Sequence, residues 1–352
     1  LEPIFLGATP RTSGGRPGGN MPGPSRSTRF FCLKRSSSVR LPAWPIISGK
    51  PHGGFNRRGI TATHKRNRSV NLQNRIQFEK PDLTALTQTA TVVDMHFHTR
   101  YSDGLNSVAA VAQRAQELGI GIAITDHNTI QGAVEISRYW NLLTIPGIEI
   151  TSREGTHVLA YFYDIKSLKR FYARDVQPYM GPEVMSAISL SMEEIIQRAR
   201  VFNAVIIFPH PYCAVYTGIC NLQFPPERRQ HLLDLVDGVE VINSENLNKW
   251  NLRCALLGFN LNKAITGGSD GHTLYHMGRV VSYTPGRKNR KTFLDAVRSG
   301  ENKIVGKEID LLRKMTSNGL KFKTTFRNCP DLLERNFKYS CMAINSRSKR
   351  LR

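Results

Sequence analysis

Seven short apolar runs, alternating with helix-like stretches, constrain the fold of this chain more than any other feature. The runs predict strands at 92–95, 121–125, 142–145, 157–162, 204–208, 238–242 and 264–266. Apolar residues at helical spacing predict amphipathic helices over 108–118 and 192–201, the second with Ser191 as its N-cap. Alternation of strand and helix favours a parallel sheet, and seven strands favour a closed or nearly closed barrel.

Potential metal ligands gather beside these runs. They include six of the ten histidines of the chain. The full set is His96, His98, Asp103, His127, Glu149, His157, His210, Asp270 and His272. Most of these residues fall at strand ends, where a barrel enzyme places a metal site. Packing of the core does not require imidazoles at the ends of several buried strands. The pattern therefore predicts a metallohydrolase.

The first motif is VVDMHFHTRYSDG, which runs from a strand into a turn. Residues two apart in a strand face the same side, so His96 and His98 would chelate one ion while Phe97 packs the other way. Asp94 would share the face of the two histidines. The SDG turn would return Asp103 toward the strand tip. The His-x-His pattern alone is a weak indication of a metal site. The SDG turn that follows it makes the indication much stronger.

Two further motifs place a ligand beside a strand. In AITDHNT, Asp126 and His127 open a loop, and the alternative is a helix cap followed by a solvent-facing histidine. In PGIEITSREGTH, Glu149 lies between two isoleucines, where a buried carboxylate needs a cation. A metal would supply that cation, and Arg153 is the alternative. His157 opens the next strand.

The last two motifs are VIIFPHPYC and AITGGSDGHT. Prolines on both sides of His210 predict an extended backbone there, which aims the imidazole. Cys213 is a candidate soft ligand, although a buried free thiol is the commoner role for such a residue. Glycines before Asp270 and His272 allow the backbone to approach a ligand closely.

The net charge of +22 is confined to the two ends of the chain. Residues 1–80 hold 15 Lys and Arg against two acidic residues, and residues 313–352 hold 11 against two, whereas 81–312 is balanced. We expect 1–80 to be disordered, because it is too polar to form a core, 81–312 to be the catalytic barrel, and 313–352 to be a basic extension. Three interpretations of 1–80 stay open: an over-extended reading frame, an organelle transit peptide and a nucleic-acid-binding arm.

The sequence has neither a recognisable secretory signal nor an apolar run long enough to span a membrane. Its six cysteines have no paired spacing, which favours reduced thiols. We expect a soluble protein of the cytoplasm, with organelle import as the alternative if 1–80 is a transit peptide.

On these motifs, the chain resembles the polymerase and histidinol phosphatase (PHP) phosphoesterases over about residues 92–282. The resemblance is carried by DMHFHT with SDG, ITDHNT, PGIEIT, FPHP and GGSDGH. The chain looks most similar to the stand-alone members, which include enzymes that hydrolyse nucleotide phosphates or trim RNA and DNA from the 5′ end. The resemblance implies a distorted (β/α)7 TIM-like barrel with a metal site at the carboxyl ends of its strands.

The resemblance also implies a centre of three metal ions that share Glu149. The implied ligand sets are His96, His98, Glu149 and Asp270; Glu149, His157 and His210; and Asp103, His127 and His272. Some members carry His where Asp103 stands, and Asp is a harder ligand that favours Mn²⁺ or Mg²⁺. We expect two or three divalent ions, with Mn, Zn, Fe and Mg as the candidates.

Clustered cations suit phosphate ester hydrolysis, because they neutralise phosphoryl oxygens and lower the pKa of a bound water to about 7. We expect a metal-bound hydroxide, held by Glu149, Asp270 and His272, to attack the phosphorus. The other candidates are Arg100 and Arg279 for the substrate phosphate, His276 for the leaving group, and Asp94 and Asp126 as supports of the ligands. Surface roles are the alternative for both arginines and for His276.

Three functions stay open. The principal hypothesis is a phosphatase or exonuclease acting on a phosphorylated small molecule or a nucleic-acid end, with basic flanks that would collect polyanions. The second is histidinol-phosphate hydrolysis. The third is a nucleic-acid-binding protein in which the barrel has only a structural role.

Overall fold

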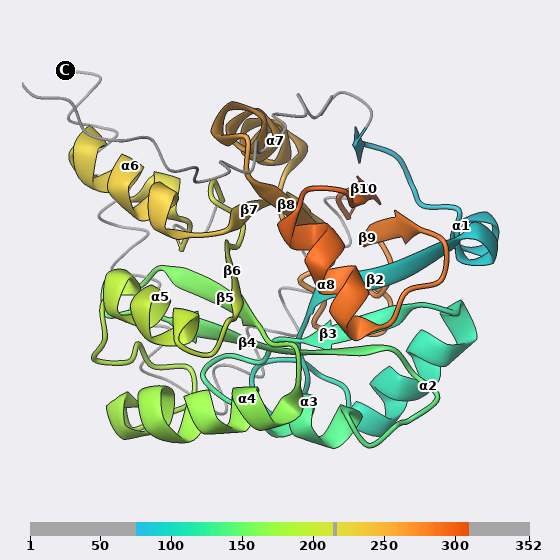
Figure 1. The fold of residues 1–352 in the computed structure, drawn as a ribbon, viewed down its shortest axis with the longest axis horizontal. Helices are drawn as coiled ribbons and strands as arrows, with labels where there is room; N and C mark the ends of the chain where they lie inside the picture. The colour runs from blue at the N-terminus through green and yellow to red at the C-terminus, as the bar shows by residue number, and fades with distance from the viewer. Residues whose placement is uncertain (1–74, 214–216, 310–352) are drawn as a thin grey trace, which may run out of the picture. The chain divides into compact units, whose positions relative to one another are not determined.

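The computed structural model describes residues 75–213 and 217–309. These residues form an α/β fold in which helices surround a single ten-stranded sheet (Figure 1). The strands are β1 (Ile76–Gln77), β2 (Ala90–Phe97), β3 (Gly121–Ile124), β4 (Thr144–Thr151), β5 (His157–Tyr161), β6 (Val205–Phe208), β7 (Gly238–Asn243), β8 (Ala264–Gly268), β9 (Val280–Pro285) and β10 (Lys303–Gly306). The α-helices are α1 (Leu83–Thr89), α2 (Val108–Leu118), α3 (Gln131–Ile136), α4 (Ile165–Phe171), α5 (Met192–Arg200), α6 (Pro226–Leu235), α7 (Asn248–Leu261) and α8 (Arg290–Arg298). The short helical turns are η2 (Tyr172–Val176), η3 (Gln177–Tyr179) and η4 (Ile219–Asn221).

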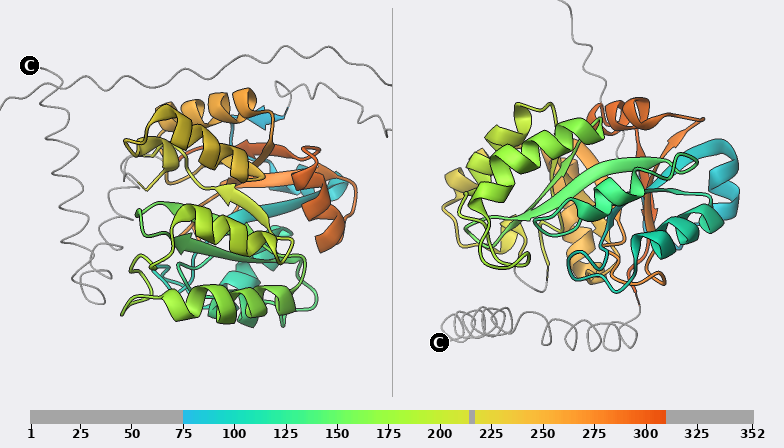
Figure 2. Two further views of the ribbon diagram at one scale, coloured as in Figure 1. Left: turned by 60° about the vertical axis from the view of Figure 1, so that its left-hand side comes forward. Right: turned by 90° about the horizontal axis from the view of Figure 1, so that it is seen from below.

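All seven predicted strands are present, as β2 to β8, and they are neighbours in the sheet in chain order. Beyond β8, Gly271 bridges Phe97 at the end of β2, and the His98 N–H donates to the Gly271 carbonyl at 2.9 Å. The sheet therefore curls until the first and last of these seven strands meet, and its curvature is visible in Figure 2. The predicted α/β barrel-like fold is confirmed.

The prediction of a parallel sheet is wrong at β5, which is antiparallel to both β4 and β6. Only residues 152–156 separate β4 from β5, and so short a link makes a hairpin because a parallel crossover needs a dozen or more residues. The reversal has a consequence for the site. His157 begins β5 and so lies at the edge where the parallel strands end.

Three strands lie outside the predicted set. β9 is antiparallel to β2, β10 is antiparallel to β9, and β1 pairs in parallel with β10. β1 belongs to the segment 1–80 that was predicted to be disordered. That prediction is wrong for residues 75–80. Arg75 anchors this strand: its buried guanidinium donates to the backbone carbonyl and to the side-chain oxygen of Asn302, at 2.9 and 3.1 Å. Residues 1–74 and the predicted extension 313–352 lie outside the described residues.

The interior of the curled sheet is filled by apolar side chains. Its buried cluster takes residues from six strands, namely Val93, Met95, Ala123, Ile145, Leu159, Tyr161, Val205, Ile207 and Ala264. Phe293, Leu294 and Val297 of α8 belong to the same cluster. Arg290 and Arg298 donate to the carbonyls of Thr144 and Ala204, which lie at the starts of β4 and β6. Helix α8 therefore closes the amino-terminal end of the barrel.

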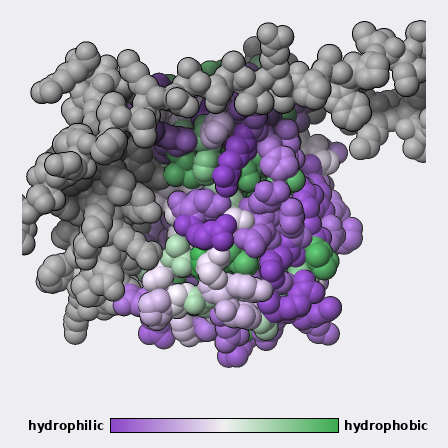
Figure 3. All heavy atoms as spheres, turned by 90° about the vertical axis from the view of Figure 1, so that its left-hand side faces the viewer, coloured by the Kyte–Doolittle hydropathy of each residue, from purple (hydrophilic) through white to green (hydrophobic). Residues whose placement is uncertain are grey.

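The two predicted helices are found as α2 and α5, the second ending one residue earlier than expected. Ser191 caps α5 as predicted, and Glu194 completes a capping box with it. The apolar sides of α5 and α6 face the core. Hydrophilic residues accordingly predominate on the described part of the face that carries these helices (Figure 3). Within the described ranges, no helix combines the length and apolar character needed to cross a bilayer.

Candidate metal centre

The structure brings all nine predicted ligands together at the carboxyl edge of the parallel strands. His96 and His98 come from the end of β2, His127 follows β3, and Glu149 lies in β4. The other members are Asp103 in the turn after β2, His157 at the start of β5, His210 after β6, and Asp270 and His272 after β8. All nine side chains are largely buried, and His157 and Asp270 are the most exposed of them, at 15% and 16%.

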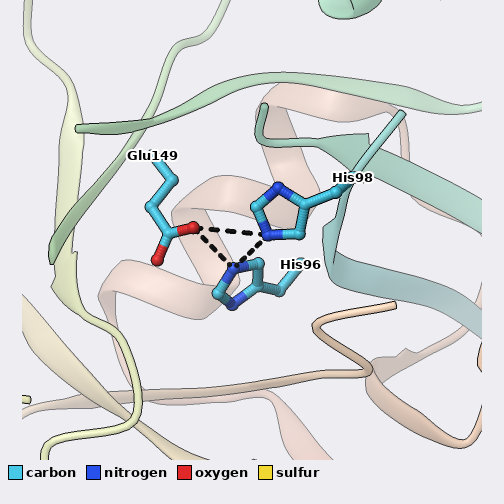
Figure 4. A group of neighbouring side chains, drawn as sticks. All are labelled: His96, His98 and Glu149. Atoms are coloured by element: carbon cyan, nitrogen blue, oxygen red, sulfur yellow. Dashed lines mark hydrogen bonds and ion pairs between the residues drawn. The ribbon is translucent and has the colours of Figure 1, made fainter. Parts of the chain in front are cut away.

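Glu149 lies at the centre of the cluster. Its Oε2 is 3.3 Å from Nε2 of His96 and 3.3 Å from Nε2 of His98 (Figure 4). Its Oε1 is 2.9 Å from Nδ1 of His157 and 3.4 Å from Nε2 of His210. One carboxylate therefore contacts imidazoles from three different strands or strand ends, as expected of a shared ligand.

The two aspartates complete the other side of the cluster. Oδ1 of Asp270 is 3.1 Å from Nε2 of His98, and Oδ2 of Asp103 is 3.0 Å from Nε2 of His272. Asp103 also lies 3.8 Å from Nε2 of His127. The turn after β2 thus returns the Asp103 carboxylate to the strand tip.

The donor atoms fit divalent metal ions. Five of them are buried without a well-aligned hydrogen bond: Oε1 of Glu149 and Nδ1 of His98, His127, His157 and His210. Oε1 of Glu149 and Nδ1 of His157 are 2.9 Å apart but are not oriented for a hydrogen bond. Leaving buried polar atoms unsatisfied is costly, and a bound cation removes that cost. Moreover, Nε2 of His96 and Nε2 of His98 are only 3.2 Å apart, which is a natural separation for two ligands of one ion.

Four overlapping groups of three residues have ligand atoms within 4.8 Å of one another. They are His96, His98 and Glu149; His98, Asp270 and His272; His98, Asp103 and His127; and His127, Glu149 and His157. The first group reproduces part of one implied ligand set. His98 belongs to three of the four groups and His127 to two, whereas each belongs to only one implied set. The division of the ligands among ions therefore stays a prediction.

The electrostatics of the cluster suit metal binding. Burial lowers the pKa of His127 to about 3, whereas Asp270 and Glu149 outweigh burial and raise the pKa of His98 to about 9. A divalent cation would take the place of the proton on His98. Burial alone would raise the pKa of Glu149. The surrounding imidazole groups of His127, His157 and His96 outweigh burial and hold that pKa well below its usual value. The central carboxylate is therefore ionised.

Comparison with known proteins agrees with this geometry. Residues 94–236 match the PHP domain, and residues 250–302 match the PHP-associated domain. The chain contains a PHP domain. The PHP-associated match extends past residue 282, where the resemblance seen in the sequence ends.

Two relatives and one solved structure illustrate the similarity of this PHP domain. An uncharacterized protein of Methanocaldococcus jannaschii, MJ1587, is 28% identical over 166 residues, which cover 43% of this chain and 81% of the relative. The 5′-3′ exoribonuclease Rnm of Salmonella typhimurium is 34% identical over 102 residues, which cover 26% of this chain but only 35% of the exoribonuclease. The crystal structure of PsfC from Pseudomonas syringae PB-5123 has a TM-score of 0.50 and 17% identity, covering 66% of this chain and 98% of that one.

Asp94 and Asp126 hold the loops that carry ligands. Asp126 accepts from the backbone N–H of Thr99 at 2.6 Å and from the hydroxyl of Ser102 at 2.9 Å, which fixes the turn leading to Asp103. Asp94 accepts from the backbone N–H groups of Ser269 at 2.9 Å and Gly278 at 3.0 Å. Burial raises the pKa of Asp94 to about 6.

Two residues that the sequence analysis missed tie the ligands to one another. Nδ1 of His96 donates to Oε1 of the buried Glu240 at 3.1 Å. The Asn243 side-chain amide donates both to Oε2 of Glu240 at 2.9 Å and to Oδ2 of Asp270 at 3.1 Å. Glu240 lies between Val239 and Val241 in β7. An acid between two apolar strand residues is the same signal that singled out Glu149.

The backbone at His210 differs from the prediction. Its φ is +31°, in the left-handed region, whereas the flanking prolines predicted an extended conformation. Proline disfavours the right-handed helical region for the residue before it but does not impose a strand. The N–H of His210 donates to Oε2 of Glu240 at 3.0 Å, and this bond holds the turn. Asp270 also has a positive φ, of +51°, so two ligands occupy uncommon backbone conformations.

The candidates for binding the substrate phosphate and protonating the leaving group differ in burial and contacts. His276 is buried, not solvent-facing, and its Nδ1 lies 2.9 Å from Oε1 of Glu245. Arg279 places its guanidinium over the Tyr275 ring, 4.2 Å from the centroid. Arg100 is exposed.

The structure also shows the positions of Arg153, the alternative partner of Glu149, and of Cys213, the candidate soft ligand. Arg153 is exposed and its guanidinium lies 3.5 Å from the Ser189 carbonyl, so imidazoles and not this arginine surround Glu149. Cys213 is a buried free thiol, as expected.

Proposed function

We propose that this PHP domain hydrolyses phosphate esters with the help of divalent metal ions, and that its substrates are nucleotide phosphates or the 5′ ends of RNA or DNA. The observation that carries the proposal is the convergence of nine candidate ligands, with Glu149 at the centre. Five donor atoms of this cluster are buried without well-aligned hydrogen bonds. The bound ions would supply positive charge for the phosphoryl oxygens and would acidify water.

Residues of the chain would supply positioning and proton transfer. Glu149, Asp270 and His272 would hold the attacking water at the cluster. His276, whose Nδ1 lies 2.9 Å from Oε1 of Glu245, is the candidate for protonating the leaving oxygen. Arg100 and Arg279 are the candidates for binding a substrate phosphate.

The similarity to Rnm supports nucleic-acid ends as the substrate class, because the protein of that name is a 5′-3′ exoribonuclease. The matched residues cover only 35% of that enzyme, so the substrate is part of the proposal. The basic flanks predicted at 1–80 and 313–352 would add non-specific attraction to a polyanion.

The test uses the full chain with Mn²⁺ and three substrates: nucleoside monophosphates, a 5′-phosphorylated single-stranded oligonucleotide and histidinol phosphate. We expect release of phosphate or mononucleotides from the first two, and loss of activity in EDTA. His98→Ala should lower kcat/KM by roughly a hundredfold or more, because loss of even a supporting partner of a metal ligand costs 10- to 100-fold.

The matched control is His231→Ala. His231 is an exposed histidine of α6 that pairs with Glu193, away from the cluster. It should leave kcat/KM unchanged. Full activity of His98→Ala, or activity that survives EDTA, would contradict the proposal. Faster hydrolysis of histidinol phosphate would favour that alternative, and salt-sensitive binding without turnover would favour a binding protein.

A further inference from the structure

Two aromatic rings, one from a loop and one from a helix, lie parallel to one another near the metal cluster. Tyr212 follows β6 and Trp250 lies in the first turn of α7. Their ring centroids are 6.4 Å apart and their planes differ by only 6°. Both side chains are partly exposed, whereas the Phe162 and Phe171 rings, which pair at 5.2 Å in the core, are buried. The Tyr212 and Trp250 pair, which we call the aromatic platform, is therefore available to a ligand in a way that core pairs are not.

The platform lies close to the ligands in the chain. Tyr212 comes two residues after His210, whose imidazole is 3.4 Å from Glu149. Two residues span at most about 7 Å. The carbonyl of Tyr212 accepts from the side-chain amide of Asn246 at 2.7 Å, so the loop after β7 fixes the loop after β6. Both loops leave the same edge of the barrel as the metal ligands.

Two cations lie over the rings of the platform. The guanidinium of Arg253 is 5.0 Å from the centroid of the Trp250 ring and 5.8 Å from that of Tyr212. The ammonium of Lys249 is 5.2 Å from the Trp250 centroid. Lys249 and Arg253 are exposed. Exposed cations over flat rings suit a ligand that combines a planar base with phosphate groups: the base would replace the cation on the ring face, and the displaced cation would meet a phosphate.

We propose that the aromatic platform stacks against the nucleobase next to the phosphate that is cleaved at the metal cluster, while Lys249 and Arg253 attract neighbouring phosphates. The inference rests on the proposed function and narrows its substrate class to esters that carry a base. Stacking suits this role because every base has a flat face, so binding tolerates different sequences. A phosphate ester without a base would gain nothing from the platform.

The decisive experiment compares two substrates on the full chain with Mn²⁺. One is a 5′-phosphorylated single-stranded oligonucleotide, and the other is the same molecule with an abasic first residue. Trp250→Leu should lower kcat/KM for the intact oligonucleotide about tenfold, within the range measured for loss of one stacked base. It should change kcat/KM for the abasic substrate less than twofold. Tyr212→Leu should behave in the same way.

Trp140→Leu is the matched control, because Trp140 is 93% exposed and lies between α3 and β4, away from the platform. It should affect neither substrate. Equal loss on both substrates in Trp250→Leu and Tyr212→Leu, or no loss on either, would overturn the inference. Thermal unfolding of each variant separates an unfolded protein from a local effect.

A binding measurement separates this inference from the proposed function. Metal-free protein is titrated with both oligonucleotides while tryptophan fluorescence is recorded. Quenching by the intact molecule only, lost in Trp250→Leu and kept in Trp140→Leu, would support the platform even if no hydrolysis is found. Hydrolysis without such quenching and without base dependence would retain the proposed function and reject the platform.

Discussion

Glu240 determines which nitrogen of His96 faces the cluster. Its Oε1 accepts a hydrogen bond from Nδ1 of His96, so the Nε2 lone pair is directed at the metal ligands. Its Oε2 accepts from the backbone N–H of His210. One buried carboxylate thus positions one ligand through its ring and another through its backbone.

Glu240→Gln should weaken binding of Mn²⁺ by about 10- to 100-fold, which is the usual effect of losing a partner of a metal-bound histidine. The amide keeps the volume of Glu240 but replaces one acceptor oxygen with a donor. Titration calorimetry with Mn²⁺ measures the affinity directly and needs no turnover. Glu301→Gln, a change at an exposed glutamate, is the control and should leave the affinity unchanged. An unchanged affinity in Glu240→Gln would assign this residue a purely structural role.

At the level of single residues, the sequence located the cluster because its members follow apolar strands in short motifs. His96 and His98 point the same way and Phe97 packs in a separate core cluster, as strand alternation predicts. The acid between Val239 and Val241 was visible in the sequence, but the contacts of Glu240 with His96 and His210 join distant strands, and the sequence could not supply those. The left-handed φ of His210 depends on the same distant carboxylate.

Lys263 stabilises the end of a neighbouring helix. Its Nζ donates to the carbonyls of Leu233, Asp234 and Val236 at 2.9, 2.7 and 2.8 Å. These carbonyls lie at the end of α6, where the last turn has no helical donors and favours a cation. A residue just before β8 therefore fastens α6 to the barrel.

Lys263→Met should lower the free energy of unfolding by about 1–2 kcal/mol, because three carbonyls lose a charged donor while the apolar stem is kept. Urea unfolding followed by circular dichroism measures this change. Lys291→Met is the control: Lys291 is exposed and pairs with Asp295 along α8, so the loss there should be about 0.5 kcal/mol or less. A loss in Lys263→Met no larger than in the control would contradict the assignment.

At the level of elements, local pattern predicted seven strands and two helices because each has enough residues to display its period. β1 has only two residues and shows no period. β10 is as long as β3 and β6, but its apolar run is only Ile304 and Val305. Strand direction was also missed at β5, since an apolar strand looks the same in either direction. The length of the 152–156 link was the available signal.

Ligands from separate parts of the chain meet in the cluster, so metal binding should stabilise the whole PHP domain. A ligand that binds only the folded state adds about 2.7 kcal/mol at a concentration of 100 times its Kd. We therefore expect Tm to rise with Mn²⁺ concentration and to fall back in EDTA. Differential scanning calorimetry measures the shift. It should largely disappear in His98→Ala and persist in His231→Ala, whereas an equal shift in both variants would indicate binding elsewhere.

Helix α8 has a consequence for how substrates reach and leave the site. Because its apolar side chains fill the barrel from the amino-terminal end, the interior beneath the ligands is solid protein. A nucleic-acid strand cannot be threaded through the barrel from one side to the other. Incoming ester and outgoing products would therefore both use the face of the barrel that carries the ligands.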